Sequence, residues 1–468
     1  MKRIVIIGGG ISGLSIAWAI SRSDPATEVV VLERGPRTGG NIRTEVVDGY
    51  RCESGPDGFL DNAPATLELA RQLGLEGRLQ PSSDAARRRY IFRKGTLHEV
   101  PTGPLAFLTT GLLSVRGKVR LLCEPFGPKA PGGDESIYGF ASRRIGREAA
   151  SVMVDSMVSG VFAGDARTLS LRACFPKMWE LEHTYGSLVK ALLATRKSRK
   201  KEDAAGAPSG RLTSFVNGMS ELVEALTDRL GPAIRLATPA TFVRHLDGGG
   251  WQVGIPGGRI DADAVVMTGP SSEAATLMYP LDESLAEDLN RIRTAPLAVV
   301  CLGYDATAAG RLPGFGFLVP RSEGVRMLGA LWETSIYTNR APEGKALLRV
   351  MIGGALDPDA AAVPDAELVQ TVRDELQRTM GLYAVPEFVR IVRHRRGIPQ
   401  YAGGHLDRLQ RIDDALTRLP GLHLAGNSYR GVSINSCIAE AAALAAQALE
   451  SAERHAASRT RNPELVTV

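Results

Sequence analysis

The chain has 468 residues, of which 44% are hydrophobic and 23% are charged, and its formal net charge is only +5. This length exceeds what one hydrophobic core usually supports, so we expect two or three domains in a large globular protein. The small net charge gives no reason to expect a nucleic-acid partner. Five scattered cysteines without close pairs indicate a reducing compartment, no structural disulfides and no metal site.

The first strand begins too early for an export signal, and no run of eighteen apolar residues is present. We therefore expect a cytoplasmic protein without a transmembrane helix. Residues 104–126 mix leucine, valine and phenylalanine with Arg116, Lys118 and Arg120. A helix lying on an anionic membrane surface has this composition. A core-packing helix with solvated basic residues has it too, so both alternatives stay open.

The start of the chain predicts a dinucleotide-binding turn. The β-branched residues 4–7 are typical of a buried parallel strand, and they lead into Gly8-Gly9-Gly10-Ile11-Ser12-Gly13 and a helix over residues 11–22. In this spacing Gly8 permits the turn, Gly10 lets backbone approach a pyrophosphate, and Gly13 lets the helix pack close to the strand. The free N–H groups of the helix N-terminus favour phosphate.

A second apolar strand, residues 29–32, ends at Glu33, twenty positions beyond Gly13. A carboxylate at this distance is expected to hold the ribose hydroxyls, so the sequence predicts a Rossmann-type site. The pair Gly39-Gly40 resembles the extended nucleotide motif of the FAD-dependent amine oxidase and phytoene desaturase superfamily. This resemblance changes the expected cofactor from NAD to FAD. The same superfamily places the turn-rich segment Gly55-Pro56-Asp57-Gly58 against the flavin.

The rest of the chain reads as alternating helical and strand blocks. We expect a helix over 64–75 capped by Asn62, a mainly helical stretch over 102–210 that ends in a solvated basic loop at 196–201, and a helix over 365–380. Strands are expected at 234–243, 251–255 and 264–267, with a glycine hairpin turn at 247–250. Residues 297–304, 316–320 and 347–354 predict a second sheet. A strand at 422–425, a glycine loop and a helix over 436–449 follow.

Four segments together resemble the protoporphyrinogen oxidase family of haem-pathway flavoenzymes: residues 8–14, 160–165, 397–401 with Gly403 and His405, and 426–438. The resemblance implies an α/β fold with a Rossmann-type FAD-binding domain assembled from both ends of the chain. Its expected divisions are an FAD-binding domain (1–85, 211–270 and 396–455), a helical membrane-facing domain (86–210), a mixed-sheet substrate-binding domain (271–395) and a polar tail (456–468).

The resemblance also implies the site residues. Those expected to bind FAD are Gly8, Gly9, Gly10, Ile11, Ser12, Gly13, Glu33, Arg34, Gly39, Gly40, Asn41, Gly55, Pro56, Asp57, Gly58, Ala240, Asn427, Val432, Ser433 and Ile434. Arg89 is expected to pair with a substrate propionate, and Gly164 to present its carbonyl to the tetrapyrrole nitrogens. Leu318, Leu331 and Met351 are expected to line the substrate cavity; Leu331 and Met351 could alternatively be plain core residues, and for Met351 the two alternatives are about even.

By this resemblance, non-covalent FAD oxidises protoporphyrinogen IX to protoporphyrin IX through three two-electron hydride transfers to flavin N5. Molecular oxygen is the acceptor and hydrogen peroxide is released. Coproporphyrinogen III oxidation to coproporphyrin III is the first alternative. A flavin amine oxidase is less favoured, because Cys437 does not lie in the turn that those enzymes use for covalent flavin. A flavin-bound scaffold without turnover is the third. Peripheral membrane contact and a homodimer are further expectations.

Overall fold

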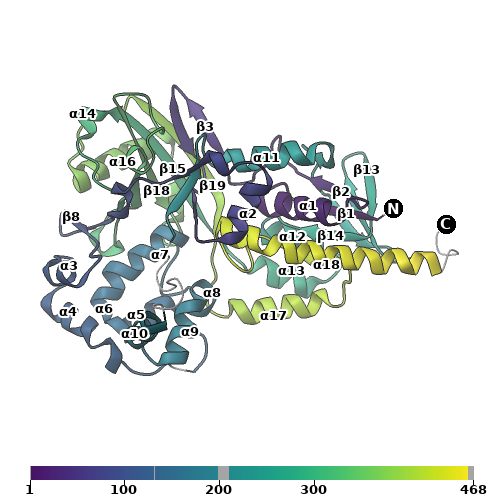
Figure 1. The fold of residues 1–468 in the computed structure, drawn as a ribbon, viewed down its shortest axis with the longest axis horizontal. Coiled ribbons are helices and arrows are strands. Elements are labelled where there is room, and N and C mark those ends of the chain that lie inside the picture. Colours follow the sequence, from purple (N-terminus) through teal and green to yellow (C-terminus); the bar gives the residue numbers. More distant parts are fainter. Residues whose placement is uncertain (1, 131, 199–209, 462–468) are drawn as a thin grey trace.

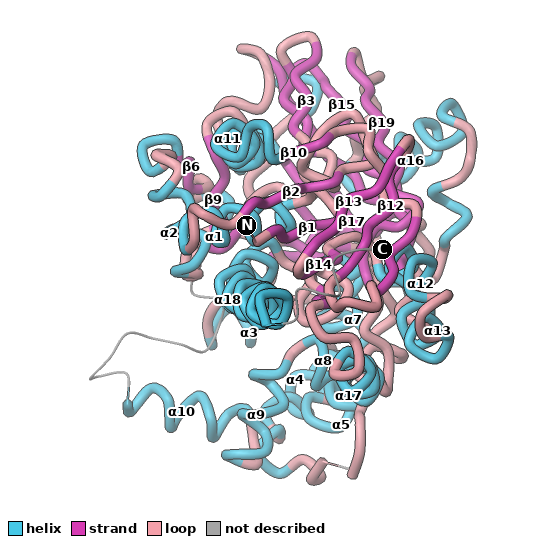
Figure 2. Tube along the Cα trace, turned by 90° about the vertical axis from the view of Figure 1, so that its right-hand side faces the viewer, coloured by secondary structure: helices cyan, strands magenta, loops and turns pink. Residues whose placement is uncertain are grey.

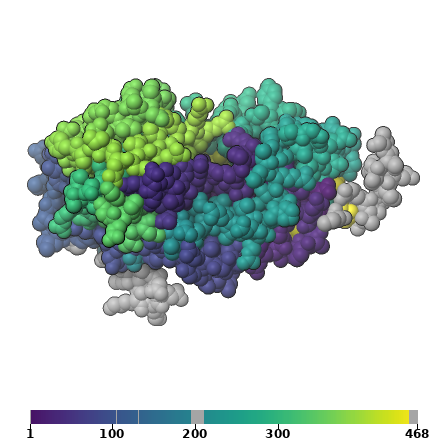
Figure 3. Space-filling model, turned by 90° about the horizontal axis from the view of Figure 1, so that it is seen from above, coloured from purple at the N-terminus to yellow at the C-terminus, as the bar shows by residue number. Residues whose placement is uncertain are grey.

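The computed structural model describes residues 2–130, 132–198 and 210–461. Figure 1 shows three regions: a parallel sheet with its helices around the two chain ends, a mixed sheet beside it, and a group of helices below the mixed sheet. In the space-filling view of Figure 3, the N-terminal segment and the segment after residue 210 share one end of the molecule, and residues 300–400 cover much of the other.

The parallel sheet joins strands from distant parts of the chain. In order across the sheet these are β10 (Ile234–Arg235), β2 (Glu28–Leu32), β1 (Arg3–Ile7), β14 (Ala264–Met267) and β20 (Leu422–Leu424). Ile4 pairs with Val29 on one side and with Ala264 on the other. The apolar runs are continuous because both faces of this sheet are covered.

Helices pack on one face of the parallel sheet, and helices with a small antiparallel sheet pack on the other. The first face carries α1 (Ile11–Ser23), α2 (Pro64–Gln72), α11 (Ser220–Leu230) and α18 (Ile434–Arg461). Figure 2 views α18 nearly along its axis beside this sheet. The second face carries β11 (Phe242–His245), β12 (Trp251–Ile255), β13 (Gly258–Ala262), α12 (Ser271–Met278), α13 (Glu283–Asn290) and α17 (His405–Leu416).

The mixed sheet has seven strands. Their order is β19 (Phe388–Pro399), β15 (Thr294–Asp305), β18 (Lys345–Gly353), β17 (Met327–Trp332), β16 (Gly316–Leu318), β7 (Tyr90–Arg93) and β8 (Thr96–Glu99). On one face, an apolar core forms against α16 (Asp365–Met380). The opposite face packs against the hairpin of β3 (Thr44–Val47) and β4 (Tyr50–Glu53). A small sheet of β5 (Phe59–Leu60), β9 (Leu212–Phe215) and β6 (Leu79–Pro81) adjoins it.

The described part of the helical region has eight α-helices, together with a 3₁₀ turn at Glu124–Phe126 and a π-helical turn at Ala150–Val154. The α-helices are α3 (Pro104–Thr109), α4 (Val115–Leu122), α5 (Ile137–Ile145), α6 (Arg147–Ala149), α7 (Asp155–Phe162), α8 (Leu171–Cys174), α9 (Pro176–Tyr185) and α10 (Leu188–Ser198). Buried Glu124 pairs with buried Arg144 and accepts hydrogen bonds from the N–H groups of Leu188 and Val189. The first N–H groups of a buried helix need hydrogen-bond acceptors. The Glu124 carboxylate provides them at the start of α10, and its ion pair with Arg144 links α10 to α5.

Several predicted elements differ from the structure. Residues 90–99 fall within the expected division 86–210, but they form strands β7 and β8 of the mixed sheet. Strand β19 crosses the expected boundary at residue 396. Residues 234–243 are two strands, because Ala237 has a φ of 49° and turns the chain from one sheet to another. Helix α2 has Ala63 as its N-cap, without a side-chain cap, so the prediction that Asn62 caps it is wrong.

Other differences concern segment lengths. Residues 104–126 form two short helices and a 3₁₀ turn, so no continuous amphipathic helix exists there. Helix α18 continues to residue 461, through the first part of the predicted polar tail, and the remainder of that tail lies outside the described residues. Of the basic loop expected at 196–201, residues 196–198 form the end of α10 instead, and residues 199–201 lie outside the described residues. Within the described segments, no helix has the length and apolar content needed to cross a bilayer.

Candidate flavin and substrate site

The glycines of the first turn lie where β1 passes into α1. Gly8 has a φ of 115°, and a methyl group on Gly13 would overlap the Gly8 carbonyl oxygen. These two glycines therefore set the turn and the close packing of α1. Gly10 is different, because a methyl group there would meet only the Cα of Gly40, at 4.0 Å. Ile11 and Ser12 begin α1, whose first turn has no side-chain cap and no acidic residue.

The second glycine pair lies against the first turn. The Gly39 N–H donates to the Gly9 carbonyl at 2.7 Å, and Gly10 and Gly39 form a β-bridge. Arg37, which the sequence reasoning missed, donates to the carbonyls of Gly40 and Ile42 and so holds this loop in shape. Two motifs separated by some thirty residues in the sequence thus form one backbone surface.

Glu33 lies at the end of β2 as expected. Its carboxylate accepts hydrogen bonds from the N–H groups of Gly9, at 2.9 Å, and Gly35, at 2.7 Å. Arg34 is exposed and forms an ion pair with Glu273, so its side chain turns outward. Ala240 lies between β10 and β11 and packs on the core of the second face.

The segment Gly55-Pro56-Asp57-Gly58, with Ser54 before it, is bonded to the mixed sheet through side chains of β18 and β19. A side chain on Gly55 would overlap the carbonyl oxygen of Asn41, so these predicted residues are in contact. His394 on β19 donates to the Ser54 carbonyl at 2.7 Å, and Arg349 on β18 donates to the Gly55 carbonyl. Neither His394 nor Arg349 was predicted, and both hold the carbonyls of this segment in place.

Below this segment lies a buried cluster of three carboxylates and two arginines. Glu53, Asp57, Glu333, Arg340 and Arg349 are all less than 10% exposed. Arg340 lies 3.5 Å from Glu53, and Arg349 lies 3.7 Å from Glu333. Burial raises the pKa of Glu53 to about 7, with Arg340 opposing the shift and Asp57 adding to it. Burial likewise raises the pKa of Glu333 well above its ordinary value.

The C-terminal loop closes the site from the other end of the chain. Asn427 lies in the loop between β20 and α18, where its carbonyl accepts a hydrogen bond from Tyr401. Ser433 caps the start of α18 through its hydroxyl, which accepts from the Ser436 N–H at 3.1 Å. Ile434 is buried in the core under the parallel sheet, and Val432 packs against the helical region. This loop therefore contacts two regions of the molecule.

Three predicted substrate residues lie on one face of the mixed sheet. Leu318 pairs with Gly329 on β17, and Gly329 pairs with Met351 on β18. Leu331, two residues beyond Gly329, points to the same face, because side chains alternate along a strand. All three are partly buried, and Leu318 also contacts Gly160 of α7, where a methyl group would lie 2.5 Å from it.

Gly164 and Arg89 occupy contrasting environments. Gly164 is buried beside Gln400, and its carbonyl accepts no hydrogen bond from any described residue. A buried carbonyl without a partner is unusual and suits a ligand donor. Arg89 is exposed at the entrance to β7, with its guanidinium 5.1 Å from the ring centre of Phe315. Across the part of the chain that the structure covers, it forms no ion pair.

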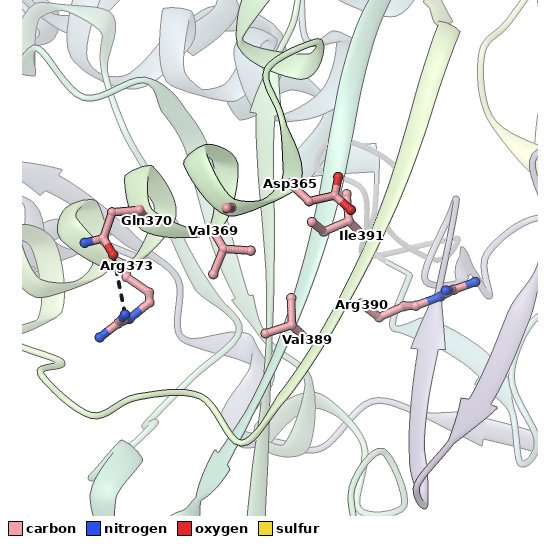
Figure 4. Close-up of a pocket in the computed structure, with 8 residues that line it drawn as sticks. Asp365, Val369, Gln370, Arg373, Val389, Arg390 and Ile391 are labelled. Carbon is pink, nitrogen blue, oxygen red and sulfur yellow. Dashed lines mark hydrogen bonds between the residues drawn. The ribbon is translucent and has the colours of Figure 1, made fainter.

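Figure 4 shows a surface cleft elsewhere, between α16 and β19. Its lining residues are Asp365, Ala366, Val369, Gln370, Arg373, Val389, Arg390 and Ile391, none of which was predicted as a site residue. In Figure 4, Arg390 points away from the cleft, in keeping with its ion pair with Glu45 on β3. This cleft is therefore separate from the flavin and substrate residues.

The residues present fit an FAD molecule. Gly10 and Gly40 leave open space above the first turn, the uncapped start of α1 offers its N–H groups to phosphate, and Glu33 lies at the ribose end. The Gly55–Gly58 segment meets Asn41 at Gly55, and the C-terminal loop approaches Ser12 at Gly426. Among the described residues, no group of histidine, cysteine and acidic side chains is arranged to hold a metal ion.

Comparisons with known proteins place the chain in a family. The model for flavin containing amine oxidoreductases matches residues 11–449. The chain belongs to this family. It is 35% identical to a chloroplastic protoporphyrinogen oxidase of Oryza sativa subsp. japonica, over 93% of this chain and 85% of the relative. It is 30% identical to the coproporphyrinogen III oxidase of Bacillus subtilis (strain 168), over 96% of this chain and 98% of the relative.

The solved structures agree with this assignment. A crystal structure from Exiguobacterium sp. 255-15 has a TM-score of 0.84 and 27% identity, and the alignment covers 96% of this chain and 99% of that one. As a flavin-containing amine oxidoreductase, the chain is an FAD-dependent enzyme with the mixed α/β fold of that family, as the sequence predicted. The glycine turn, Gly39-Gly40 and the C-terminal loop therefore belong to a flavoprotein.

Proposed function

We propose that this flavoenzyme oxidises protoporphyrinogen IX to protoporphyrin IX in haem biosynthesis, with molecular oxygen as the acceptor. The observation that carries the proposal is the apolar row of Leu318, Gly329 and Met351, which lies on the sheet face that also holds the Gly55–Gly58 segment. A tetrapyrrole macrocycle with largely apolar faces suits such a surface. Named relatives at 30–35% identity act on porphyrinogens, as their names state.

FAD, when bound, supplies the acceptor for the hydride removed from the substrate. The residues of the chain then orient the macrocycle and exclude water. Leu318, Leu331 and Met351 contact its apolar surface, the Gly164 carbonyl accepts a hydrogen bond from a pyrrole N–H, and Arg89 pairs with a propionate. The planar guanidinium matches two carboxylate oxygens, and Phe315 supports it from one side.

The proposed divisions of the chain follow from the same assignment. The FAD-binding part comprises 1–85, 211–270 and 396–455, and the substrate-binding part comprises 271–395 together with strands β7 and β8. Within 271–395, helices α12 and α13 pack on the parallel sheet and so join the two parts. The proposed FAD contacts are the predicted glycines, Glu33, Asn41, Asn427 and the stretch from Val432 to Ile434, while Arg34 serves through its backbone because its side chain pairs with Glu273.

We also propose that the helical region binds a membrane surface through an apolar patch on α3, α4 and the 3₁₀ turn after α4. The patch consists of exposed Leu105, Leu108, Val115, Val119, Leu122 and Phe126. Val115, Val119 and Leu122 follow helical spacing, so α4 turns an apolar stripe outward. Arg116 is exposed beside it and suits anionic headgroups.

The test is an anaerobic mixture of purified holoenzyme with protoporphyrinogen IX. We expect the oxidised flavin absorbance to disappear, and admission of air to restore it with formation of peroxide and porphyrin fluorescence. A flavin spectrum that stays oxidised would refute the proposal. The second candidate is coproporphyrinogen III, favoured by the match over 98% of the Bacillus subtilis relative. The ratio of kcat/KM for the two porphyrinogens decides between them.

A further inference from the structure

Tyr401 lies behind the C-terminal flavin loop and is bonded to it at two points. The residue is only 2% exposed. Its hydroxyl donates to the Asn427 carbonyl at 2.6 Å and accepts from the Gly431 N–H at 2.8 Å. One oxygen atom therefore joins the two ends of the loop formed by residues 427–431.

His405, on the first turn of α17, adds a third bond to the same loop. Its ring stacks on Tyr401 with 4.2 Å between ring centres and 15° between planes. Burial lowers the pKa of His405 to about 4, so the ring is neutral at physiological pH. Its Nε2 lies 2.8 Å from the Tyr429 carbonyl, and since a carbonyl only accepts, the proton is on Nε2.

The segment 400–405 is also bonded to the helical region, close to the turn that contains Gly164. The Gln400 side chain donates to the Phe162 carbonyl at 2.8 Å, and the Gly403 N–H donates to the Thr168 carbonyl at 3.0 Å. The Tyr401 carbonyl accepts from the Ser170 N–H at 2.8 Å. The segment thus lies between the Gly164 turn and the flavin loop and contacts both through hydrogen bonds.

We infer that Tyr401 is a positioning residue, whose hydroxyl fixes the 427–431 loop against bound FAD and sets the distance between the flavin and the substrate held near Gly164. This inference rests on the proposed function for its substrate, and on the family for its cofactor. Hydride transfer depends steeply on the separation of donor and acceptor, so a small shift of this loop lowers the rate of the chemical step.

The chain offers a matched control in the same loop. Tyr429 is also 2% exposed, but its hydroxyl has no hydrogen-bond partner among the residues that the structure describes. Tyr401→Phe and Tyr429→Phe therefore remove the same atom from the same depth of the protein. Only the first leaves the Asn427 carbonyl and the Gly431 N–H without their partner.

The experiment compares FAD affinity, flavin midpoint potential and steady-state kinetics for the wild type and the two variants. We expect Tyr401→Phe to weaken FAD binding 10- to 100-fold and to shift the flavin potential. With saturating FAD it should lower kcat at least tenfold while KM changes less than threefold. Tyr429→Phe should stay within twofold of the wild type in each quantity.

Equal FAD affinity and potential in the two variants would overturn the inference. Thermal melts of both apoproteins report whether they fold, and if Tyr401→Phe does not, His405→Ala removes the third bond to the loop and allows the same comparison. If the wild type oxidises no porphyrinogen but Tyr401→Phe alone loses FAD affinity, the role of Tyr401 holds and the proposed substrate is refuted.

Discussion

A methyl group at Gly10 should weaken FAD binding without affecting the fold. Gly10 has φ −77° and ψ 178°, a conformation open to alanine, and the new methyl would meet only the Gly40 Cα at 4.0 Å. It would therefore extend into the space that the backbone leaves for a pyrophosphate. We expect Gly10→Ala to change the folded protein little and to obstruct the cofactor.

The two contributions to stability nearly cancel. Replacing glycine by alanine in an allowed conformation gains about 0.4–1 kcal/mol, because the unfolded chain loses freedom. Alanine is a poorer N-cap than glycine, which costs roughly the same amount. The free energy of unfolding of the apoprotein should thus change by less than about 0.5 kcal/mol. Forcing a methyl against a bound phosphate costs about 1–3 kcal/mol, which weakens FAD binding roughly 10- to 100-fold.

Gly13→Ala is the matched comparison, because its methyl would overlap the Gly8 carbonyl oxygen inside the protein. This variant should lower the free energy of unfolding by about 1–3 kcal/mol or more. Urea denaturation of the apoproteins and FAD titration by fluorescence quenching measure both quantities. Wild-type FAD affinity in Gly10→Ala, or a destabilised Gly10→Ala apoprotein, would refute this account of the turn.

Three further predictions follow from other parts of the structure. The pKa of Glu53 is raised to about 7, so the proton it binds stabilises the fold below about pH 4.5, and that stabilisation is lost as the pH rises through 7. Between pH 5 and 8 the free energy of unfolding of the wild type should fall by up to about 3 kcal/mol more than that of Glu53→Gln. Urea denaturation measures both, and the same pH dependence in the two proteins would contradict the prediction. Arg89→Ala should raise KM for the porphyrinogen about tenfold with FAD affinity unchanged, while Arg88→Ala, whose arginine pairs with Glu99, serves as the control. An unchanged KM would remove Arg89 from the site. Phe126→Asp, at a position 88% exposed, should reduce sedimentation with anionic vesicles, whereas Val385→Asp, at an exposed position on another region, should not. Equal losses from both variants would argue against the patch.

The sequence predicted best those parts of the fold that local pattern determines. The β1–α1–β2 unit lies within a few residues of its predicted bounds, and the helix predicted over 365–380 has those bounds in the structure. Strand β19 was missed because its sequence, FVRIVRHRRGIP, carries arginines at an edge of the sheet and lacks the apolar alternation of a half-buried strand. Strands β7 and β8 join the mixed sheet through a pairing with β16 more than two hundred residues away, which no local pattern reports.

The predicted site residues were mostly those that glycine spacing identifies. The residues that were missed are polar side chains that donate hydrogen bonds to the backbone of these loops. Arg349 is a single arginine within an apolar run, and only the strand register shows that it reaches the Gly55 carbonyl. Tyr401 is the last residue of the motif segment 397–401, but its hydrogen bonds join segments that are distant in the sequence. Such contacts depend on the tertiary arrangement of several elements.

Strand β18 connects the proposed substrate surface to the proposed flavin surface. Met351 and Arg349 are two residues apart, so they point to the same face of the sheet at a separation fixed by the strand backbone. Met351 lies in the apolar row with Gly329 and Leu318, and Arg349 holds the segment that contains Gly55. Because a strand in the middle of a seven-stranded sheet is rigid, it holds the proposed substrate wall at a constant distance from the flavin segment. In the proposed site, the Tyr401 hydroxyl holds the 427–431 loop in a comparable way, through its hydrogen bonds to the Asn427 carbonyl and the Gly431 N–H.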